Sequence, residues 1–542
     1  MSTQPQEKNE PKQSLSYFMD PKNWWGPLLF ILIVSVAGVG MIGFQTYNDA
    51  PPMGGFVDEA GTVIISQQTI EQGQEVFHRY ALMEYGSMFG DGAQRGPDFT
   101  AEALHRISIS MTEFYANEYT SAHGTAPSDL ERRMIQESVK DELKLNRHDD
   151  ATDLVTLSAA QLFALAQLKE YYIDLYTSPR TDKAFPPANY ISNKDELADL
   201  AAFFYWGAWV CVAQRPGSNF SYTHNWPYDP DAGNTPTSPT IIWSVIGMLA
   251  FVLACGVVLY FIGQYNQLSN KFFKAPSKDL LTMKRVDGMK PSATQRAAFK
   301  FFFVAIILFF LQVFSGILTI NSFTDYFGFI GIDFSVLLPV TVTRSWHLML
   351  SLYWISTCWI ASSIFIIPIL AKTEVKGQLK LINLLFVMLF VLVAGSVSGM
   401  YLGPMGYLDE WWFWLGHQGW EFVDLGKLYQ ALLMLIFILW AVIIFRGVRP
   451  ALIKGEPWNI PNWLLYSVIG IPVFFISGFV TRPETNFVIA DFWRWMVIHM
   501  WVEAFFEVFV TVIVSYLVVL MGLVSRQAAI RVIYFATLLS LG

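Results

Sequence analysis

Long apolar runs recur along this 542-residue sequence and restrict its fold more than any other feature. About 20 apolar residues form a helix long enough to cross the hydrocarbon core of a membrane. Within that core a helix satisfies all of its own backbone hydrogen bonds. Such runs are expected near residues 24–45, 240–263, 299–320, 342–370, 382–403, 428–446, 460–480 and 493–521, with a ninth from about 530. The sequence therefore predicts an all-α polytopic membrane protein.

The composition agrees with a membrane protein and argues against other classes. Only 15% of the residues are charged and 53% are hydrophobic, whereas soluble domains carry about 25% charged residues. A net charge of −8 without any basic block excludes a nucleic-acid partner. The three cysteines form no CxxC or CxxCH motif, which argues against disulfides, a cysteine zinc site and covalently attached haem c.

Loop charges predict the orientation of the spans. Lysine and arginine gather in residues 264–300, whereas 321–341 and 404–424 contain neither. By the positive-inside rule, the basic loops are cytoplasmic and the other loops lie outside. We therefore expect a multi-pass protein of the bacterial cytoplasmic (inner) membrane.

A long polar insert separates the first two spans. We expect residues 1–45 to form a cytoplasmic N-terminus and the first span, 46–238 a periplasmic domain, and 239–542 the catalytic helix bundle. The insert is long enough to bury its own core. Within it, 128–146 and 159–177 have the composition of helices.

Only two of the eight histidines, His347 and His499, lie inside predicted spans, and they lie at similar depth. An ionisable residue inside a span is costly and is a functional candidate by default. Arg344 precedes His347 by three residues and shares its helix face. Haem matches this pair, because its iron binds imidazole and its propionates bind arginine. The alternative is that the histidines are satisfied core residues and Arg344 marks the membrane boundary.

A polar stripe is predicted in the last long span. His499, Glu503 and Glu507 recur at i, i+4 and i+8, which places them on one face of an α-helix. Imidazole with carboxylate suits non-haem iron, whereas the structural alternative is a polar stripe facing another helix. On an outer loop, Glu421 and Asp424 are candidate oxygen ligands for calcium.

Several motifs together resemble the large catalytic subunit of the nitric oxide reductases, of the quinol-dependent single-chain type, in the haem–copper oxidase superfamily. The motifs are GQEVFHRYALMEYGSMFGDGA (73–93), GPDFTAE (96–102), SYTHNWPYDP (221–230), RSWHLMLSLYW (344–354), FWLGHQGWEFVDLG (413–426) and HMWVEAFFE (499–507). The resemblance implies a haem–copper oxidase-like helix bundle preceded by an outer-side cytochrome c-like domain without haem.

The resemblance also implies a role for the candidate residues in the spans. His347 corresponds to one axial ligand of a low-spin haem b, with Arg344 near a propionate. His499 and Glu503 resemble ligands of the non-haem iron that stands beside a high-spin haem of the b3 type. Glu507 resembles a proton-handling carboxylate near that iron.

On the outer side, Glu421 with Asp424 nearby matches the position where the family holds calcium between the haem propionates and the outer domain. Gln94 stands where the family offers a tyrosine to that calcium. The chain also ends, at Gly542, before the family's paired iron-binding histidines and the helix that carries the remaining haem ligands. We therefore expect a C-terminally incomplete binuclear centre.

The quinol pocket of the resembled type is altered here. Its His…Glu…Phe pattern corresponds to Asn321, Asp325 and Phe329. Asn321 cannot take up a proton near neutral pH, whereas quinol oxidation needs a base within reach. Quinol is therefore expected to be a poor electron donor.

The leading expectation is an enzyme in a lipid bilayer that reduces nitric oxide to N2O and water. A homodimeric assembly is left open. One alternative is nitric oxide dismutase, which converts nitric oxide to N2 and O2 without an external donor. The altered quinol pocket favours the dismutase, and the presence of Glu503 argues against it. A non-enzymatic scaffold or transporter is disfavoured, because no inverted repeat is found.

Overall fold

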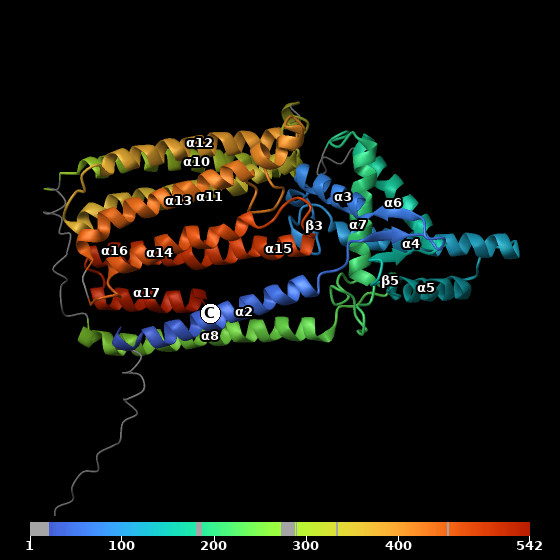
Figure 1. Cartoon of the computed structure of the whole chain (residues 1–542), viewed down its shortest axis with the longest axis horizontal. Coiled ribbons are helices and arrows are strands. Elements are labelled where there is room, and N and C mark those ends of the chain that lie inside the picture. Colours follow the sequence, from blue (N-terminus) through green and yellow to red (C-terminus); the bar gives the residue numbers. More distant parts are fainter. Residues whose placement is uncertain are drawn as a thin grey trace, which may run out of the picture.

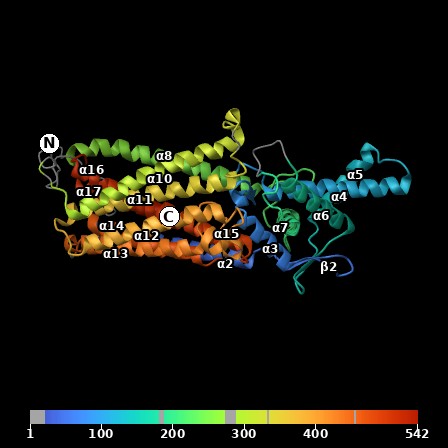
Figure 2. The ribbon, with the colours of Figure 1, turned by 90° about the horizontal axis from the view of Figure 1, so that it is seen from above.

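Long helices run together at one end of the molecule, and a smaller domain of helices and short strands lies at the other (Figure 1). The view from above shows the same separation (Figure 2). This computed structural model describes residues 21–179, 187–272, 288, 290–331, 334–452 and 455–541, without the side chains of 257–272 and 502–505.

The expected spans form helices. Among the residues described, seven helices are long and apolar enough to cross a membrane, so the predicted multi-pass fold is confirmed. These are α2 (Trp25–Asn48), α8 (Ser238–Phe272), α10 (Ala293–Thr324), α11 (Val340–Ala371), α12 (Gln378–Leu402), α13 (Lys427–Val448) and α14 (Ile460–Phe475). Short turns accompany them: η1 (Pro21–Asn23), η3 (Gly328–Ile330), η4 (Asp409–Trp411), η5 (Trp412–Gly416), η6 (Arg449–Ala451) and η7 (Ile476–Phe479).

The eighth expected span is one helical run whose middle part winds differently. It consists of α15 (Phe487–Trp495), the π-helical segment η8 (Met496–Phe506) and α16 (Glu507–Leu520), and α17 (Arg526–Leu541) follows. The run starts earlier than predicted because the Asn486 side chain caps it by accepting from the backbone N–H of Val488. Segments of π-helix are rare and frequently occur at functional sites.

Large apolar side chains fill the interior of the bundle. Phe437, Trp440 and Phe509 are at most 1% exposed, and the rings of Trp440 and Phe509 meet edge to face with centroids 4.8 Å apart. The buried indole N–H of Trp440 donates to the Ser363 hydroxyl at 3.0 Å. The core therefore combines apolar packing with a satisfied polar atom.

The outer domain consists mainly of helices packed around α7. Its helices are α3 (Gln67–Arg79), η2 (Leu82–Glu84), α4 (Phe99–His123), α5 (Asp129–Lys144), α6 (Ala159–Thr177) and α7 (Lys194–Val212). All residues of α7 from Leu200 to Val212 are buried. The two helices predicted within this segment are confirmed as α5 and α6, each of which starts with a reciprocal Ser–Glu or Ser–Gln cap.

Short strands complete the outer domain. A four-stranded sheet has the order β2 (Val63–Ser66), β1 (Gly55–Val57), β6 (Leu154–Thr156), β5 (His148–Asp149), and only β1 and β6 are parallel. β3 (Ser87–Met88) and β4 (Asp91–Gly92) form a hairpin that reaches toward the helix bundle. The limits 46–238 of this domain stay a prediction, as does its placement on the periplasmic side.

Candidate functional site

Arg344 lies in the first turns of α11 and pairs with two carboxylates from distant parts of the chain. Its guanidinium contacts Glu84 of the outer domain and Glu421 of the loop before α13. Glu84 is fully buried and Glu421 is 5% exposed. A buried charge is costly unless it is paired, and Arg344 is the cation that both acids contact. We call the surface where residues 74–91 meet the helix bundle the domain seam.

A second arginine repeats this arrangement on the helix of the predicted iron ligands. The Nη2 atom of Arg494 in α15 donates to Asp91 of the outer domain at 2.6 Å, and Nε donates to Asp491 at 3.0 Å. The Arg494 side chain is 3% exposed. His347 therefore follows Arg344 by three residues, and His499 follows Arg494 by five. Each of these arginines pairs with an acid of the outer domain.

Asp424 is engaged within its own loop and by α11. His417 Nδ1 lies 3.1 Å from Asp424 Oδ1, to which the backbone N–H of Gly419 also donates at 3.0 Å. The Ser345 hydroxyl donates to the other oxygen. Burial alone raises the pKa of Asp424, but His417 and these hydrogen bonds outweigh burial and hold the pKa below its usual value. The calcium assignment of Asp424 stays a prediction, in which the ion would share these two oxygens with the hydrogen bonds they accept.

Glu84 is a site residue that the sequence did not single out. Burial raises the pKa of Glu84 to about 8, against the opposing charge of Arg344. Its Oε1 is buried without a hydrogen-bond partner among the residues described. Glu84 thus places one available carboxylate oxygen close to Glu421, so this pair fits a cation better than Asp424 does. The sequence feature that could have indicated Glu84 is an acidic residue inside the apolar stretch LMEY (82–85).

The geometry of His347 fits a haem ligand. Its Nδ1 lies 2.9 Å from the backbone carbonyl oxygen of Gln312 in α10, so Nδ1 carries the proton that it donates. The other ring nitrogen, Nε2, is then the one that can bind iron, the arrangement most metal-binding histidines adopt. Gly316 allows the ring to approach α10, because a methyl group there would lie 2.8 Å from Nδ1 and Cε1 of His347. Gln312 Nε2, at 3.3 Å from His347 Nε2, would have to move when iron binds.

The polar stripe of the last long span is described only in part. His499 lies in η8 and Glu507 starts α16, and both are exposed in the described chain. The side chain of Glu503 lies outside the described residues. The predicted stripe assumed α-helical winding, whereas η8 has the wider i→i+5 hydrogen-bonding of a π-helix. Within the described part of the chain, no group of three metal-binding side chains forms around His499.

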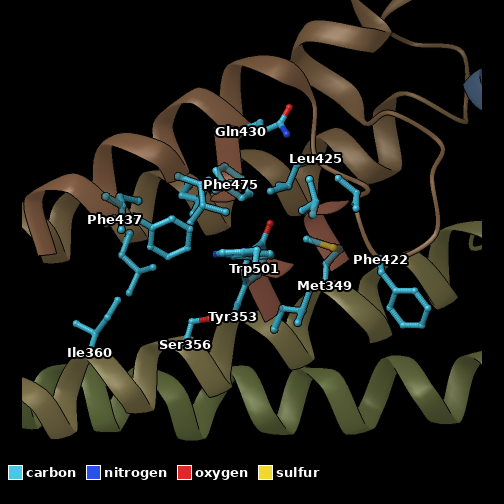
Figure 3. A pocket seen from close by; sticks show the side chains of 17 residues that line it. Met349, Tyr353, Ser356, Ile360, Phe422, Leu425, Gln430, Phe437, Phe475 and Trp501 are labelled. Carbon is cyan, nitrogen blue, oxygen red and sulfur yellow. The ribbon is translucent and has the colours of Figure 1, made fainter. Parts of the chain in front are cut away.

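An apolar cavity lies on the other side of η8, between it and α11 to α14 (Figure 3). Trp501 projects into the cavity beside Phe437 and Phe475. Its buried indole N–H has no hydrogen-bond partner among the described residues. The few polar lining residues include Tyr353 and Gln430. The cavity therefore suits a small, weakly polar molecule better than an ion.

The three residues of the altered quinol pocket are not gathered into one site. Asn321 is buried, and its side-chain oxygen accepts from the backbone N–H of Phe327 at 2.7 Å. Its backbone carbonyl accepts from the N–H of Asp325, which ends α10 in a left-handed conformation. Phe329 is 93% exposed. Asn321 thus serves a turn, and Phe329 does not pack on it.

His78 of α3 is a further seam residue that the sequence did not indicate. Its ring lies between Trp420, at a centroid distance of 4.3 Å, and Phe487, at 5.9 Å. It is 2% exposed, and its Nδ1 lies 3.4 Å from the carbonyl oxygen of Gly419. Burial lowers the pKa of His78 to about 3, and the neighbouring charges of His417 and Arg494 act in the same direction.

Two family models match separate parts of the chain. Residues 54–228 match the cytochrome c-like domain of the NorB subunit of nitric oxide reductase, and residues 296–542 match cytochrome c and quinol oxidase polypeptide I. A similar curated protein is the NorB subunit of the nitric oxide reductase of Stutzerimonas stutzeri, which is 24% identical over 243 residues. The alignment covers 44% of this chain and 49% of that relative, so the chain spans about half the length of the curated relative it matches.

We predict that replacing His78 with phenylalanine makes the domain seam less sensitive to acid. A solvent-exposed imidazole has a pKa near 6.5, whereas His78 stays neutral to about pH 3. The separated state therefore binds more protons, and seam stability is present above pH 6.5 and lost as the pH falls toward 3. At pH 5 the titration of His78 lowers the free energy that stabilises the seam by about 2 kcal/mol. His78→Phe keeps the ring packing and removes the titration.

The measurement is thermal unfolding of the protein in detergent at pH 7.5 and pH 5, followed by tryptophan fluorescence. The melting temperature should fall less between the two pH values in His78→Phe than in the wild type. His123→Phe is the control, because His123 is an exposed histidine at the end of α4. An equal fall in His78→Phe and the wild type would contradict the prediction.

Proposed function

The chain belongs to the haem–copper oxidase superfamily and is nitric oxide reductase-like, and from this premise we propose that it converts two molecules of nitric oxide to nitrous oxide and water. The reaction consumes two electrons and two protons, which an external donor and the solvent supply. We place the protein in a bacterial inner membrane with residues 46–238 on the periplasmic side.

The observation that carries this proposal is the orientation of His347. Its Nδ1–H is held by the Gln312 carbonyl at 2.9 Å, which leaves Nε2 for a haem iron. Arg344 follows the same helix face and is the cation that would meet a propionate. Binding of the propionate there would compete with Glu84 and Glu421, which now occupy the guanidinium.

Haem and non-haem iron, which the family implies, supply electron transfer and the binding of nitric oxide when they are present. We assign the non-haem iron to His499 and Glu503, and proton transfer to Glu507. An imidazole and a carboxylate on one helix are suitable ligands for such an iron. Carboxylates also lower the cost of holding a cation and protons inside the membrane. The assignment rests on the motif at 499–507 and on the π-helical winding of this segment.

The apolar cavity beside η8 supports nitric oxide as the substrate. Nitric oxide is small and uncharged, so it partitions into an apolar space without the desolvation cost that an ion would meet. Trp501 of η8 lines the cavity, whereas His499, two residues before it, is exposed, since residues two apart on a helix do not share a face. Substrate held there would be close to the helix that carries the proposed iron ligands.

The second candidate function is nitric oxide dismutation, in which two nitric oxide molecules give N2 and O2 without external electrons. The observation that favours it is the turn around Asn321, which lacks a titratable group at that position and leaves Phe329 exposed. Retention of Glu503 favours the reductase, which we keep as the proposed function.

We predict that Glu503→Ala depletes iron without loss of haem. Removing an anionic ligand leaves a dication under-neutralised in a low-dielectric site, and iron affinity should fall at least about 10-fold to 100-fold. In protein loaded with haem and iron, metal analysis measures the iron content and the optical spectrum measures the haem content. Nitric oxide consumption should fall in parallel with the iron content. Glu410→Ala, an exposed acid of η4, is the matched control. Normal iron content with normal turnover in Glu503→Ala would sink the assignment.

We also predict that quinol drives the protein poorly. Asp325 stands at the glutamate position of the pattern and has a shorter side chain, and a reacting group misplaced by about 1 Å can cost on the order of 100-fold in rate. Asn321, at the histidine position, cannot accept the quinol proton. With nitric oxide supplied, N2O should form at least about tenfold faster with an artificial electron donor than with ubiquinol or menaquinol analogues. Asn321→His restores a titratable group and should narrow this difference.

Analysis of the gases that the protein forms from nitric oxide separates the two candidate functions. N2O that appears only when a donor is present supports the reductase. N2 and O2 that appear from nitric oxide without any donor would replace the reductase with the dismutase. Rapid quinol-driven N2O formation by the wild type would contradict the prediction for the turn around Asn321.

A further inference from the structure

A cluster of three metal-binding side chains lies in the outer domain and includes no residue of the domain seam. His105 projects from α4, and Asp229 and Asp231 belong to the loop that leads to α8. One ligand atom of each residue lies within 4.8 Å of the others. Among the residues described, this is the group of histidine, cysteine and acidic side chains that meets that criterion.

The loop holds Asp229 in a fixed orientation. Asp229 is 6% exposed, and its Oδ1 accepts from the backbone N–H groups of Asp231 at 2.8 Å and Ala232 at 3.1 Å. Two backbone hydrogen bonds between Asp229 and Asn234 close the loop. Asn234 is itself fixed by its side-chain bond to the Cys211 carbonyl at 2.9 Å. With Oδ1 used in this way, Oδ2 points out of the loop toward α4.

The distances at His105 fit one shared ion. Its Nδ1 lies 3.1 Å from Asp229 Oδ2 and 3.8 Å from Asp231 Oδ2. Ligands bound tetrahedrally at about 2.1 Å stand roughly 3.4 Å apart, and the two observed distances bracket that value. The partial exposure of His105 and Asp231 leaves room for water at the remaining position.

We propose that His105, Asp229 and Asp231 form a binding site for a divalent first-row transition ion of the zinc class. One imidazole with two carboxylates suits such an ion, whereas calcium and magnesium take oxygen ligands. The two carboxylates supply the charge that neutralises a dication. Lys140 and Lys144 lie against Gly233 of the same loop, and Lys144 donates to Asn234 Oδ1 at 3.2 Å.

The bound ion would fasten the loop to α4. Asp231 lies seven residues before Ser238, where α8 begins, so the ion would fix the outer domain close to the start of the second span. A simple hydrogen bond between His105 and Asp229 is the competing explanation of the same geometry. The two explanations differ at Asp231, which a metal site needs and a hydrogen bond does not.

The test is zinc binding by the whole chain in detergent, after removal of metals with a chelator. Bound zinc is counted by metal analysis, and affinity is measured by competition with a zinc-binding dye. His105→Ala should bind one equivalent of zinc fewer than the wild type. Asp231→Asn, which keeps the contact between His105 and Asp229, should weaken that equivalent at least about tenfold. His123→Ala, from the other end of α4, is the matched control and should bind as the wild type does.

A stability measurement accompanies the count. Zinc should raise the melting temperature of the outer domain in the wild type, because a ligand that binds only the folded state stabilises it. The increase should be absent in His105→Ala, and the circular dichroism of that variant shows whether it is folded. Equal zinc equivalents and an equal increase in the wild type, His105→Ala and Asp231→Asn would overturn the proposal.

Discussion

Two arginines, Arg344 of α11 and Arg494 of α15, each pair with one acid of the outer domain and with a second acid outside it. Glu84 and Asp91 meet them at the domain seam. Breaking a buried ion pair by removal of one partner costs about 3–5 kcal/mol, so each arginine couples the docking of the outer domain to the position of its own helix. The contact between domain and bundle therefore combines ion pairs with apolar packing, such as that of the His78 ring on Trp420.

This coupling gives the outer domain a function that requires no haem of its own. The chain has no CxxCH motif, yet its cytochrome c-like domain supplies acids that pair with Arg344 and Arg494, which precede His347 and His499 by three and five residues. The loop of residues 417–424 adds to the same contact, since His417 Nε2 lies 3.0 Å from the Arg79 carbonyl oxygen. Haem propionates at Arg344 would enter an already charged and buried environment. The outer domain, this loop and the helices α11 and α15 thus form one electrostatic unit.

The sequence predicted the spans and the ligand candidates, because hydropathy and helical spacing are local signals. It did not indicate Glu84 or His78, since the importance of each arises from contacts with residues more than 250 positions away. It also did not indicate the hydrogen bonds of His417 and Ser345 to Asp424, which no motif shows. The π-helical winding of η8 was also missed, because its apolar pattern is compatible with an α-helix. Local pattern therefore identified the residues, and long-range packing decided their partners.

The most direct test of whether His347 binds haem is the low-spin haem signal of the haem-loaded protein, recorded by optical and EPR spectroscopy. His347→Ala should abolish the six-coordinate low-spin signal, because it removes the imidazole whose Nδ1 is held by the Gln312 carbonyl. Gly316→Ala should shift the signal by displacing the ring. Gly247→Ala in α8, where a methyl group meets nothing within 4 Å, should leave it unchanged. A low-spin spectrum in His347→Ala identical to that of the wild type would contradict the account.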